Sequence, residues 1–336
     1  MAIRWGIIGC GDVCEVKSGP GFQKAEGSEL VAVMRRTPGQ AEDFACRHHV
    51  PRWYTDVSTL IADPEIDAVY IATPPGSHLE ISRLVALAGK PAYIEKPMAR
   101  NAAECREMIK LFKAANTPLF VAYYRRSLPR FQKVAELFPQ LGALRKVSYT
   151  FTRNPLVDLE PLPWRLEVEQ SGGGLFLDIG CHALDLLDHL LGPLEQVSGN
   201  ARNIAGLYDV EDTVSLNWTW ASGTPGSAEF QFSGNADRDE FVFEGEKGSL
   251  RAACFDTTPI RLQLHDEPEE SIEAPNPDHV HQPMIQAVTD ELTGKGASPS
   301  SGRSAVRTNL VMDAVLSAYY AGRTDAFWTR AAQWPK

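Results

Sequence analysis

The first 122 residues alternate short apolar runs with longer helix-like segments. Five runs have the length of buried strands: Ile3–Ile8, Leu30–Met34, Ala68–Ala72, Ala92–Ile94 and Leu119–Ala122. Three helical stretches lie between them, at Gly39–His48, His78–Ala88 and Ala102–Ala115. Short buried strands that alternate with helices are typical of a parallel, doubly wound sheet. We therefore predict an α/β domain of this kind at the N-terminus.

The pattern changes after Tyr123. A proline-rich loop runs over 155–163, a helix-like segment covers 172–192, and strands with strict apolar–polar alternation follow. The alternating apolar positions are Val214, Leu216, Trp218 and Trp220, then Phe230 and Phe232, then Phe241 and Phe243. Alternation with a period of two predicts an antiparallel sheet with one apolar and one polar face. The polar side carries Ser215, Asn217, Thr219, Glu229 and Gln231.

Length supports a division into two domains, because 336 residues exceed one ordinary hydrophobic core. We place the first domain at 1–123 and a second α/β domain, with an open, mostly antiparallel sheet, at 124–336. Further helices are expected at about His281–Leu292 and Ser304–Ala321, and the last of them is expected to pack back on the first domain.

Composition excludes several functional classes. The net charge of -10 argues against a nucleic-acid partner, since phosphate binding needs clustered Lys and Arg. The apolar run at the N-terminus is too short for a secretory signal, and no stretch reaches the roughly 18 apolar residues of a membrane helix. The six cysteines lack the spacing of a disulfide framework or zinc finger, so we expect small buried thiols in a cytoplasmic protein.

The segment WGIIGCGDVC contains a glycine motif, Gly9-x-Gly11-x-x-Cys14, directly after the first strand. In this position the first glycine permits a tight turn, and the second lets the backbone approach a pyrophosphate. The helix N-terminus beyond, with Asp12 and Val13, is expected to supply N–H donors. An ordinary glycine turn is the alternative. We favour a dinucleotide-binding Rossmann domain, with Cys14 as the small third residue of the motif.

The end of the second strand carries Arg35 and Arg36. An acidic residue there hydrogen-bonds the ribose 2′-hydroxyl of NAD, whereas Arg suits the 2′-phosphate of NADP. A solvated turn with two basic residues is the alternative. The sequence favours NADP over NAD.

The segment YIEKPMA, at 93–99, places Lys96 just beyond the fifth strand. Ligands bind at the carboxyl ends of the strands in such sheets, so Lys96 is placed to reach a substrate. Pro97 restrains the backbone beside it, and a cis bond is one means of doing so. Taken alone, a lysine before a turn is usually a surface residue.

The segment GGGLFLDIGCHALDLLDHLLG, at 172–192, reads as a buried amphipathic helix with two unusual residues. Asp178 and His182 are four residues apart, about one helical turn, so both project from one face. They are either a catalytic pair or a cap and a hydrogen-bonded core histidine. Asp185 and Asp188 alternate with Leu, which indicates an outer or capping role.

Three of these segments, in this order, resemble the glucose–fructose oxidoreductase/inositol dehydrogenase/MocA (GFO/IDH/MocA) family. They are the glycine motif at 9–14, EKP at 95–97 and the segment at 172–192. The segments TPPGSH at 73–78 and RRSLP at 125–129 are also similar to family segments. The resemblance implies a Rossmann domain, an α/β domain with an open sheet, and oxidation or reduction of a carbinol carbon in sugars, polyols and related compounds. It also implies that Gly9 and Gly11 hold the pyrophosphate. The residues that would line the cofactor near its nicotinamide are Thr73, Pro74, His78 and Glu95.

The resemblance further implies a catalytic set of Lys96, Asp178 and His182. Oxidising an alcohol releases a hydride and a proton. An imidazole, with an ordinary pKa of about 6.5, suits proton transfer in either direction. We expect His182 to transfer the proton and Lys96 to stabilise charge on the substrate oxygen. Asp178 would orient the imidazole or bind a neighbouring hydroxyl. Further candidate contacts to a polyhydroxylated substrate are Tyr124, Arg126, Trp164 and Arg165.

Other interpretations remain open. A family member of this kind can be a cofactor-recycling NAD(P)-dependent glycoside hydrolase, or a non-catalytic NADP-binding sensor. A metal centre is disfavoured, because zinc needs three or four convergent ligands and no HExxH or Cys/His cluster supplies them. The polar sheet face fits either a wet homodimer interface or a monomer, and we favour the homodimer.

Overall fold

The computed structural model describes residues 2–156 and 160–320, and these residues form two compact units. Unit 1 comprises 2–128 and 277–306, and unit 2 comprises 129–156, 160–276 and 307–320. Parts of three predictions lie outside the described residues. They are residues 157–159 of the proline-rich loop, residue 321 at the end of the last predicted helix, and residues 321–336 of the second predicted domain.

Unit 1 contains a six-stranded parallel sheet, sheet A, in the order β3-β2-β1-β4-β5-β6. Its strands are β1 (Ile3–Ile8), β2 (Ser28–Met34), β3 (Arg52–Tyr54), β4 (Ala68–Ile71), β5 (Ala92–Ile94) and β6 (Leu119–Val121). The strand order reverses at β1, which lies between β2 and β4. This is the Rossmann topology, in which a ligand binds at the reversal, outside the carboxyl ends of the strands. The predicted fold of the first domain is confirmed.

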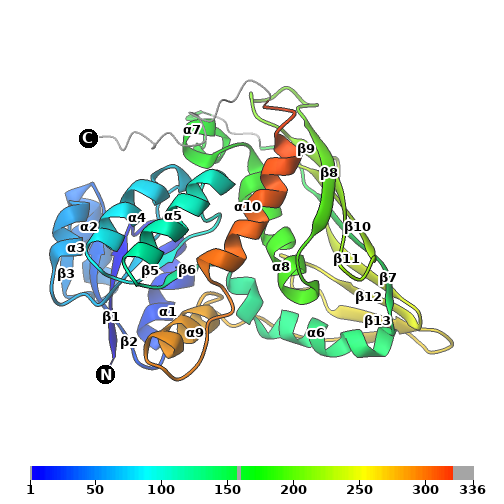
Figure 1. Ribbon diagram of the computed structural model, residues 1–336, viewed down its shortest axis with the longest axis horizontal. Coiled ribbons are helices and arrows are strands. Elements are labelled where there is room, and N and C mark those ends of the chain that lie inside the picture. Colours follow the sequence, from blue (N-terminus) through cyan, green and yellow to red (C-terminus); the bar gives the residue numbers. More distant parts are fainter. Residues whose placement is uncertain (1, 157–159, 321–336) are drawn as a thin grey trace. The chain divides into compact units, whose positions relative to one another are not determined.

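Helices cover this sheet, and α4 and α5 lie side by side (Figure 1). The helices of unit 1 are α1 (Gly19–Lys24), α2 (Pro38–Arg47), α3 (Val57–Ala62), α4 (His78–Leu87), α5 (Ala102–Ala114) and α9 (Gln282–Leu292). Side-chain caps fix two of the helix starts. Asp56 accepts from the Thr59 amide at 2.8 Å before α3, and Asn101 accepts from the Glu104 amide at 2.9 Å before α5.

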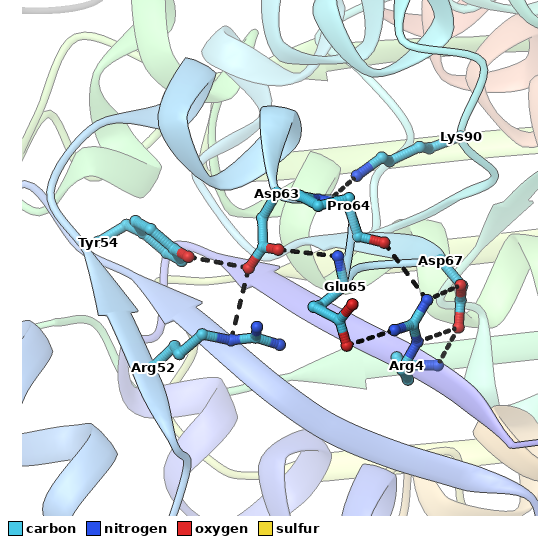
Figure 2. Close-up of polar contacts among 8 residues, drawn as sticks. All are labelled: Arg4, Arg52, Tyr54, Asp63, Pro64, Glu65, Asp67 and Lys90. Carbon is cyan, nitrogen blue, oxygen red and sulfur yellow. Dashed lines mark hydrogen bonds and ion pairs between the residues drawn. The ribbon is translucent and has the colours of Figure 1, made fainter.

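Ion pairs and hydrogen bonds connect the residues at the amino edge of sheet A (Figure 2). Arg4, at the start of β1, donates to Asp67 through Nε and Nη2, at 3.0 and 2.8 Å, and to Glu65 at 2.7 Å. Asp63 accepts the Tyr54 hydroxyl at 2.8 Å and lies 3.4 Å from Nε of Arg52. These pairs are partly exposed, so they contribute modestly to stability.

Unit 2 contains an eight-stranded mixed sheet, sheet B, in the order β14-β13-β12-β11-β7-β10-β9-β8. Its strands are β7 (Leu144–Thr152), β8 (Glu195–Arg202), β9 (Thr213–Thr219), β10 (Pro225–Gln231), β11 (Arg238–Gly245), β12 (Gly248–Ala252), β13 (Ile260–Leu264) and β14 (Glu270–Ile272). Strands β7 and β10 pair in parallel, and the other neighbours pair antiparallel. The predicted open, mostly antiparallel sheet is confirmed.

Helices α6 (Pro129–Leu141) and α8 (Cys181–Leu191) lie on the same side of sheet B (Figure 1). The apolar side chains of the alternating pattern are buried, among them Val214, Leu216, Phe230 and Phe241. The polar positions between them are exposed or half-buried. Sequence alternation therefore identified the core face. The homodimer remains a prediction.

Two further helices complete the described chain. Helix α7 (Val168–Ser171) precedes the glycine run, and α10 (Gly302–Leu316) begins in unit 1 and continues in unit 2. None of the helices within 2–156 and 160–320 combines the length and apolar character needed to cross a membrane. Five cysteines are buried and Cys46 is exposed, so the expected burial holds for all but one.

The helix predicted over 172–192 begins later than expected. Gly172 adopts a left-handed conformation (φ 92°) and ends α7. A Cβ on Gly174 would lie 2.4 Å from the Glu211 carbonyl oxygen, so this glycine is required for packing. The helical segment then opens with a π-turn, Phe176–Gly180, before the regular helix α8. Single π-turns in helices occur frequently at functional sites, and this one carries Asp178.

Candidate active site

The glycine motif forms a tight turn between β1 and the next helical segment. Gly9 has φ +89°, and a Cβ there would lie 2.7 Å from Cγ2 of Thr73, so a larger residue is excluded by both strain and contact. Gly11 differs, because its Cβ would meet nothing among the described residues nearer than the Gly9 carbonyl oxygen at 3.9 Å. The fold itself does not require glycine at position 11.

The segment after this turn is a π-turn, Cys14–Ser18, followed by the short helix α1. Val13 stands at its start and is half-buried, while Asp12 is exposed. Cys14 is fully buried, as expected for the small third residue of the motif. Burial also raises the pKa of the Cys10 thiol to about 11, so this group stays protonated at neutral pH.

The two arginines follow β2 directly, at the carboxyl edge of sheet A. Arg35 is half-exposed, and its Nη1 donates to the Cys10 carbonyl in the glycine turn at 3.4 Å. Arg36 is exposed. The contact ties the basic pair to the same turn that the glycine motif forms.

The loop after β4 carries Thr73 and Pro74, and His78 holds it in place. The His78 ring is fully buried. Its Nε2 lies 2.7 Å from the Thr73 carbonyl, and its Nδ1 lies 3.0 Å from the Met98 carbonyl. Burial lowers the pKa of His78. His78 thus joins the loop after β4 to the loop after β5, which is a positioning role.

Glu95 and Lys96 follow β5, and the Lys96–Pro97 bond is cis, as considered from the sequence. Glu95 is buried, accepts the Tyr70 hydroxyl and accepts the Lys96 amide at 3.2 Å. Burial raises the pKa of the Glu95 carboxyl. The carboxyl therefore fixes the backbone from which the half-exposed Lys96 side chain projects.

His281 also belongs to this cluster, and no local pattern around it in the sequence indicates this contact. It is fully buried, its Nδ1 lies 3.6 Å from Oε1 of Glu95, and its ring stacks on Tyr124 at 4.2 Å. Burial and the nearby cations Lys17, Lys96 and Arg125 hold the pKa of His281 well below its ordinary value. A neutral imidazole therefore lies beside Glu95.

Tyr124 and Arg126, the candidate substrate contacts after β6, make internal contacts. Tyr124 is buried, and its hydroxyl accepts from Arg125 at 2.7 Å. Arg126 is buried and donates to the Pro299 carbonyl at 2.7 Å and to Oγ of Ser304 at 3.0 Å. These contacts bind the loop to the end of unit 1 that returns from 277–306.

A pocket of about 170 Å³ opens where β2 and β3 end. Its lining combines the strand ends, the first turn of α3 and one side of α4, namely Met34, Thr55, Asp56, Val57, Ser58, Glu80, Ile81 and Leu84. It lies on the same sheet edge as Arg35.

In unit 2, Asp178 is bound by the loop that precedes it. Nε of Arg165 donates to Oδ2 of Asp178 at 2.8 Å, and the Arg165 guanidinium lies 4.4 Å from the centre of the Trp164 ring. Both loop side chains are at least half-exposed, whereas Asp178 is mostly covered. The structure thus brings together three residues that the sequence singled out separately.

His182 lies on α8, one residue after its start, and is 5% exposed. The ring of Phe255 meets it edge to face, with the centroids 5.6 Å apart. Phe255 lies far along the chain and carries no motif, so sequence reasoning missed it. Lys96 belongs to unit 1, and Asp178 and His182 belong to unit 2.

The expected outer or capping role of Asp185 and Asp188 is wrong. Both are buried, at 1% and 4% exposure. Asp188 pairs with Arg307 (Nε to Oδ2 2.8 Å), and Asp185 accepts the Thr308 hydroxyl at 3.3 Å. These acids join α8 to α10, a helix that the local pattern around them did not reveal. Within the described ranges, no group of three or more His, Cys, Asp and Glu side chains is placed to hold a metal ion.

Comparison with known proteins agrees with this architecture. Residues 3–123 match the model of the oxidoreductase family with an NAD-binding Rossmann fold, GFO/IDH/MocA, and 131–251 match a GFO/IDH/MocA C-terminal domain. Oxidoreductase P35 of Formosa agariphila is 38% identical over 319 residues, covering 93% of this chain and 97% of its own. A trans-1,2-dihydrobenzene-1,2-diol dehydrogenase of Mus musculus is 31% identical over 277 residues, or 80% of each chain.

Among solved structures, aldose–aldose oxidoreductase from Caulobacter crescentus, complexed with glycerol, has the same fold. Its TM-score is 0.85 at 24% identity, over 96% of this chain and 99% of the other. With both domains matched and a curated relative aligned along nearly its whole length, the chain is an enzyme that belongs to the GFO/IDH/MocA family of nicotinamide-dependent oxidoreductases.

Proposed function

We propose that this protein is an NADP-dependent dehydrogenase or reductase that transfers a hydride between the nicotinamide and a carbinol or carbonyl carbon. The proposed substrate is a sugar, polyol or related diol. The names of the relatives support this class, since one is a dehydrogenase of a vicinal diol. Trp164 offers an aromatic ring, and Arg165 and Asp178 offer polar groups, which together suit a hydroxylated ring.

The preference for NADP rests on Arg35 and Arg36. The residues directly after β2 are two arginines and no acid, and a guanidinium group can form charge-assisted hydrogen bonds with a 2′-phosphate. Gly9 and Gly11 are proposed to hold the pyrophosphate, with Asp12 and Val13 beside them. Thr73 and Pro74 would lie near the nicotinamide. His78 and Glu95, which are buried, would hold the loops after β4 and β5 that carry these residues and Lys96.

Three side chains are proposed to perform the proton chemistry. When bound, the nicotinamide accepts or supplies the hydride. His182 takes the hydroxyl proton in oxidation and returns it in reduction, and Lys96 stabilises the negative charge on the substrate oxygen. Asp178, held by Arg165, orients the imidazole or binds a neighbouring hydroxyl.

The observation that carries the proposal is the setting of His182. His182 is 5% exposed and lies four residues after Asp178, whose carboxylate belongs to a π-turn and is bound by Arg165 of the preceding loop.

Replacement of His182 tests the proposal directly. His182→Ala should lower kcat by about hundredfold or more, because it removes the proton-transfer group, while the Kd for NADPH stays within about twofold. The matched control is His189→Ala, an exposed histidine on the same helix, which should leave kcat unchanged. Near-normal turnover by His182→Ala would remove His182 from the mechanism.

A substrate panel distinguishes the alternatives. Sugars, inositols and vicinal diols are assayed with NADP and NAD separately, following the absorbance of the reduced nicotinamide. A dehydrogenase shows stoichiometric absorbance change, whereas a cofactor-recycling hydrolase releases product without it. Tight NADPH binding with no turnover of any compound would favour the sensor.

A further inference from the structure

A short loop in unit 2 carries the aromatic ring that contacts His182. We define the 253–259 loop as the residues that connect β12 to β13. Its backbone forms hydrogen bonds with two charged side chains: Asp239 on β11 accepts from loop amides, and Arg130 on α6 donates to loop carbonyls. The loop has no regular structure of its own, so these two residues set its shape.

Asp239 binds the amide groups of the loop. Its carboxylate accepts the amides of Cys254, Phe255 and Asp256, at 2.9, 2.5 and 2.9 Å. The hydroxyl of Tyr149, on the neighbouring strand β7, donates to the same carboxylate at 2.8 Å. One carboxylate that accepts three successive amides fixes the backbone direction at Phe255.

Arg130 binds the carbonyl groups at the two ends of the same loop. Its Nε donates to the Ala253 carbonyl at 3.4 Å, and its Nη2 donates to the Thr258 carbonyl at 2.6 Å. Arg130 is 1% exposed, and burial lowers its pKa. Burial of a guanidinium is costly in free energy unless the group is hydrogen-bonded. The carbonyl ends and the amide centre of the loop are thus held by opposite charges.

The loop delivers Phe255 to His182. The Phe255 ring packs on Phe151 at 5.5 Å and meets the His182 imidazole at 5.6 Å, with an interplanar angle of 83°. Edge-to-face aromatic contacts have a preferred geometry, so the ring restricts the orientations of the imidazole. Phe255 is half-exposed.

We propose that Phe255 is a positioning residue for His182 and that the clamp of Asp239 and Arg130 fixes it in that role. The inference rests on the proposed function, because it assumes that His182 transfers the proton. It adds a contact that limits the imidazole to the orientation needed for catalysis. Misplacement of a catalytic group by about 1 Å costs about hundredfold in rate, which gives the scale of the effect.

The experiment compares Phe255→Leu with Asp239→Asn. Each should lower kcat about tenfold or more, with little change in KM and none in the Kd for NADPH. Asp239→Asn keeps one acceptor oxygen and replaces the other with an NH₂ group, which cannot accept from the loop amides. The substitution therefore acts on His182 only through the loop. Phe138→Leu is the matched control, a half-buried phenylalanine that packs on Phe243 in the same unit.

Double variants separate positioning from general destabilisation. If Phe255 acts through His182, adding Phe255→Leu to His182→Ala produces no further loss of kcat. Phe255→Leu and Asp239→Asn together should likewise lose little more than the larger single effect. If Asp239→Asn fails to fold, Phe255→Leu and its combination with His182→Ala still decide.

Two results would overturn the inference. The first is full kcat in Phe255→Leu while His182→Ala is inactive. The second is a further loss of kcat when Phe255→Leu is added to His182→Ala. Full activity of His182→Ala is a different result, since it contradicts the proposed function itself.

Discussion

The carboxyl edge of sheet A and the Asp178–His182 segment of unit 2 are built in different ways. At the glycine turn of the sheet edge, the shape comes from backbone: Gly9 makes the turn, and Gly11 leaves its surface open. In unit 2 the residues of the proposed site are held by side chains from outside their helix, since Arg165 binds Asp178 and Phe255 contacts His182. Backbone features of this kind follow from local sequence, whereas a side-chain arrangement depends on the whole unit.

The comparison predicts that changes at the sheet edge alter cofactor binding and changes in unit 2 alter turnover. Lys96 is the sharpest test, because it belongs to unit 1 but is proposed to act on the substrate. Lys96→Ala should lower kcat by about hundredfold or more, through loss of charge stabilisation, with a smaller effect on the Kd for NADPH.

Lys90→Ala is the control for that prediction. Lys90 also lies in unit 1, but its Nζ donates to the Asp63 carbonyl at the amino edge (Figure 2). We expect the kcat of Lys90→Ala to equal that of the wild type. If Lys96→Ala mainly weakens NADPH binding, Lys96 belongs to the cofactor site and the simple division between units stands.

The two glycines should fail in different ways. Gly11→Val should fold normally but weaken NADPH binding about tenfold or more, because its side chain fills the space left for the ligand. Gly9→Ala should instead destabilise the fold by about 1–3 kcal/mol, owing to the positive φ and the contact with Thr73. Thermal unfolding and fluorescence titration with NADPH measure both effects. Equal NADPH affinity in Gly11→Val and the wild type would contradict the proposed pyrophosphate site at Gly9 and Gly11.

The arginine pair should affect one cofactor only. In Arg35→Ala/Arg36→Ala, the KM for NADP should rise about tenfold or more, because hydrogen bonds to a charged phosphate are lost. The KM for NAD should stay nearly constant, which makes NAD the internal control. A wild-type enzyme that prefers NAD would end the argument from Arg35 and Arg36.

The smallest effect is expected at the amino edge. Hydrogen bonding to Arg4 lowers the pKa of Asp67 in the folded state, so the pair stabilises the protein above the ordinary carboxyl pKa. This contribution is lost as the pH falls through the lowered pKa. Asp67→Asn should therefore reduce Tm slightly at neutral pH, the difference should vanish in acid, and kcat should not change. A pH-independent difference would point to lost packing instead.

Short-range patterns predicted most of the fold. Apolar runs located five strands of sheet A, and alternation located the core face of sheet B. The strand β3, Arg52–Tyr54, was missed because it has only three residues, which are charged or aromatic, and none of them is buried. The start of the segment at 172 was misplaced, because the Glu211 contact that requires Gly174 comes from far along the chain.

The sequence by itself predicted the doubly wound parallel sheet and the glycine turn, because strand periodicity and glycine conformations are local properties. The family followed from the resemblance of three motifs, which are also local. Only the tertiary structure decided that Asp185 and Asp188 are buried against α10, that His281 lies beside Glu95, and that Phe255 meets His182. These contacts join segments separated by many residues, and burial, which sets their energies, is a property of the folded chain alone.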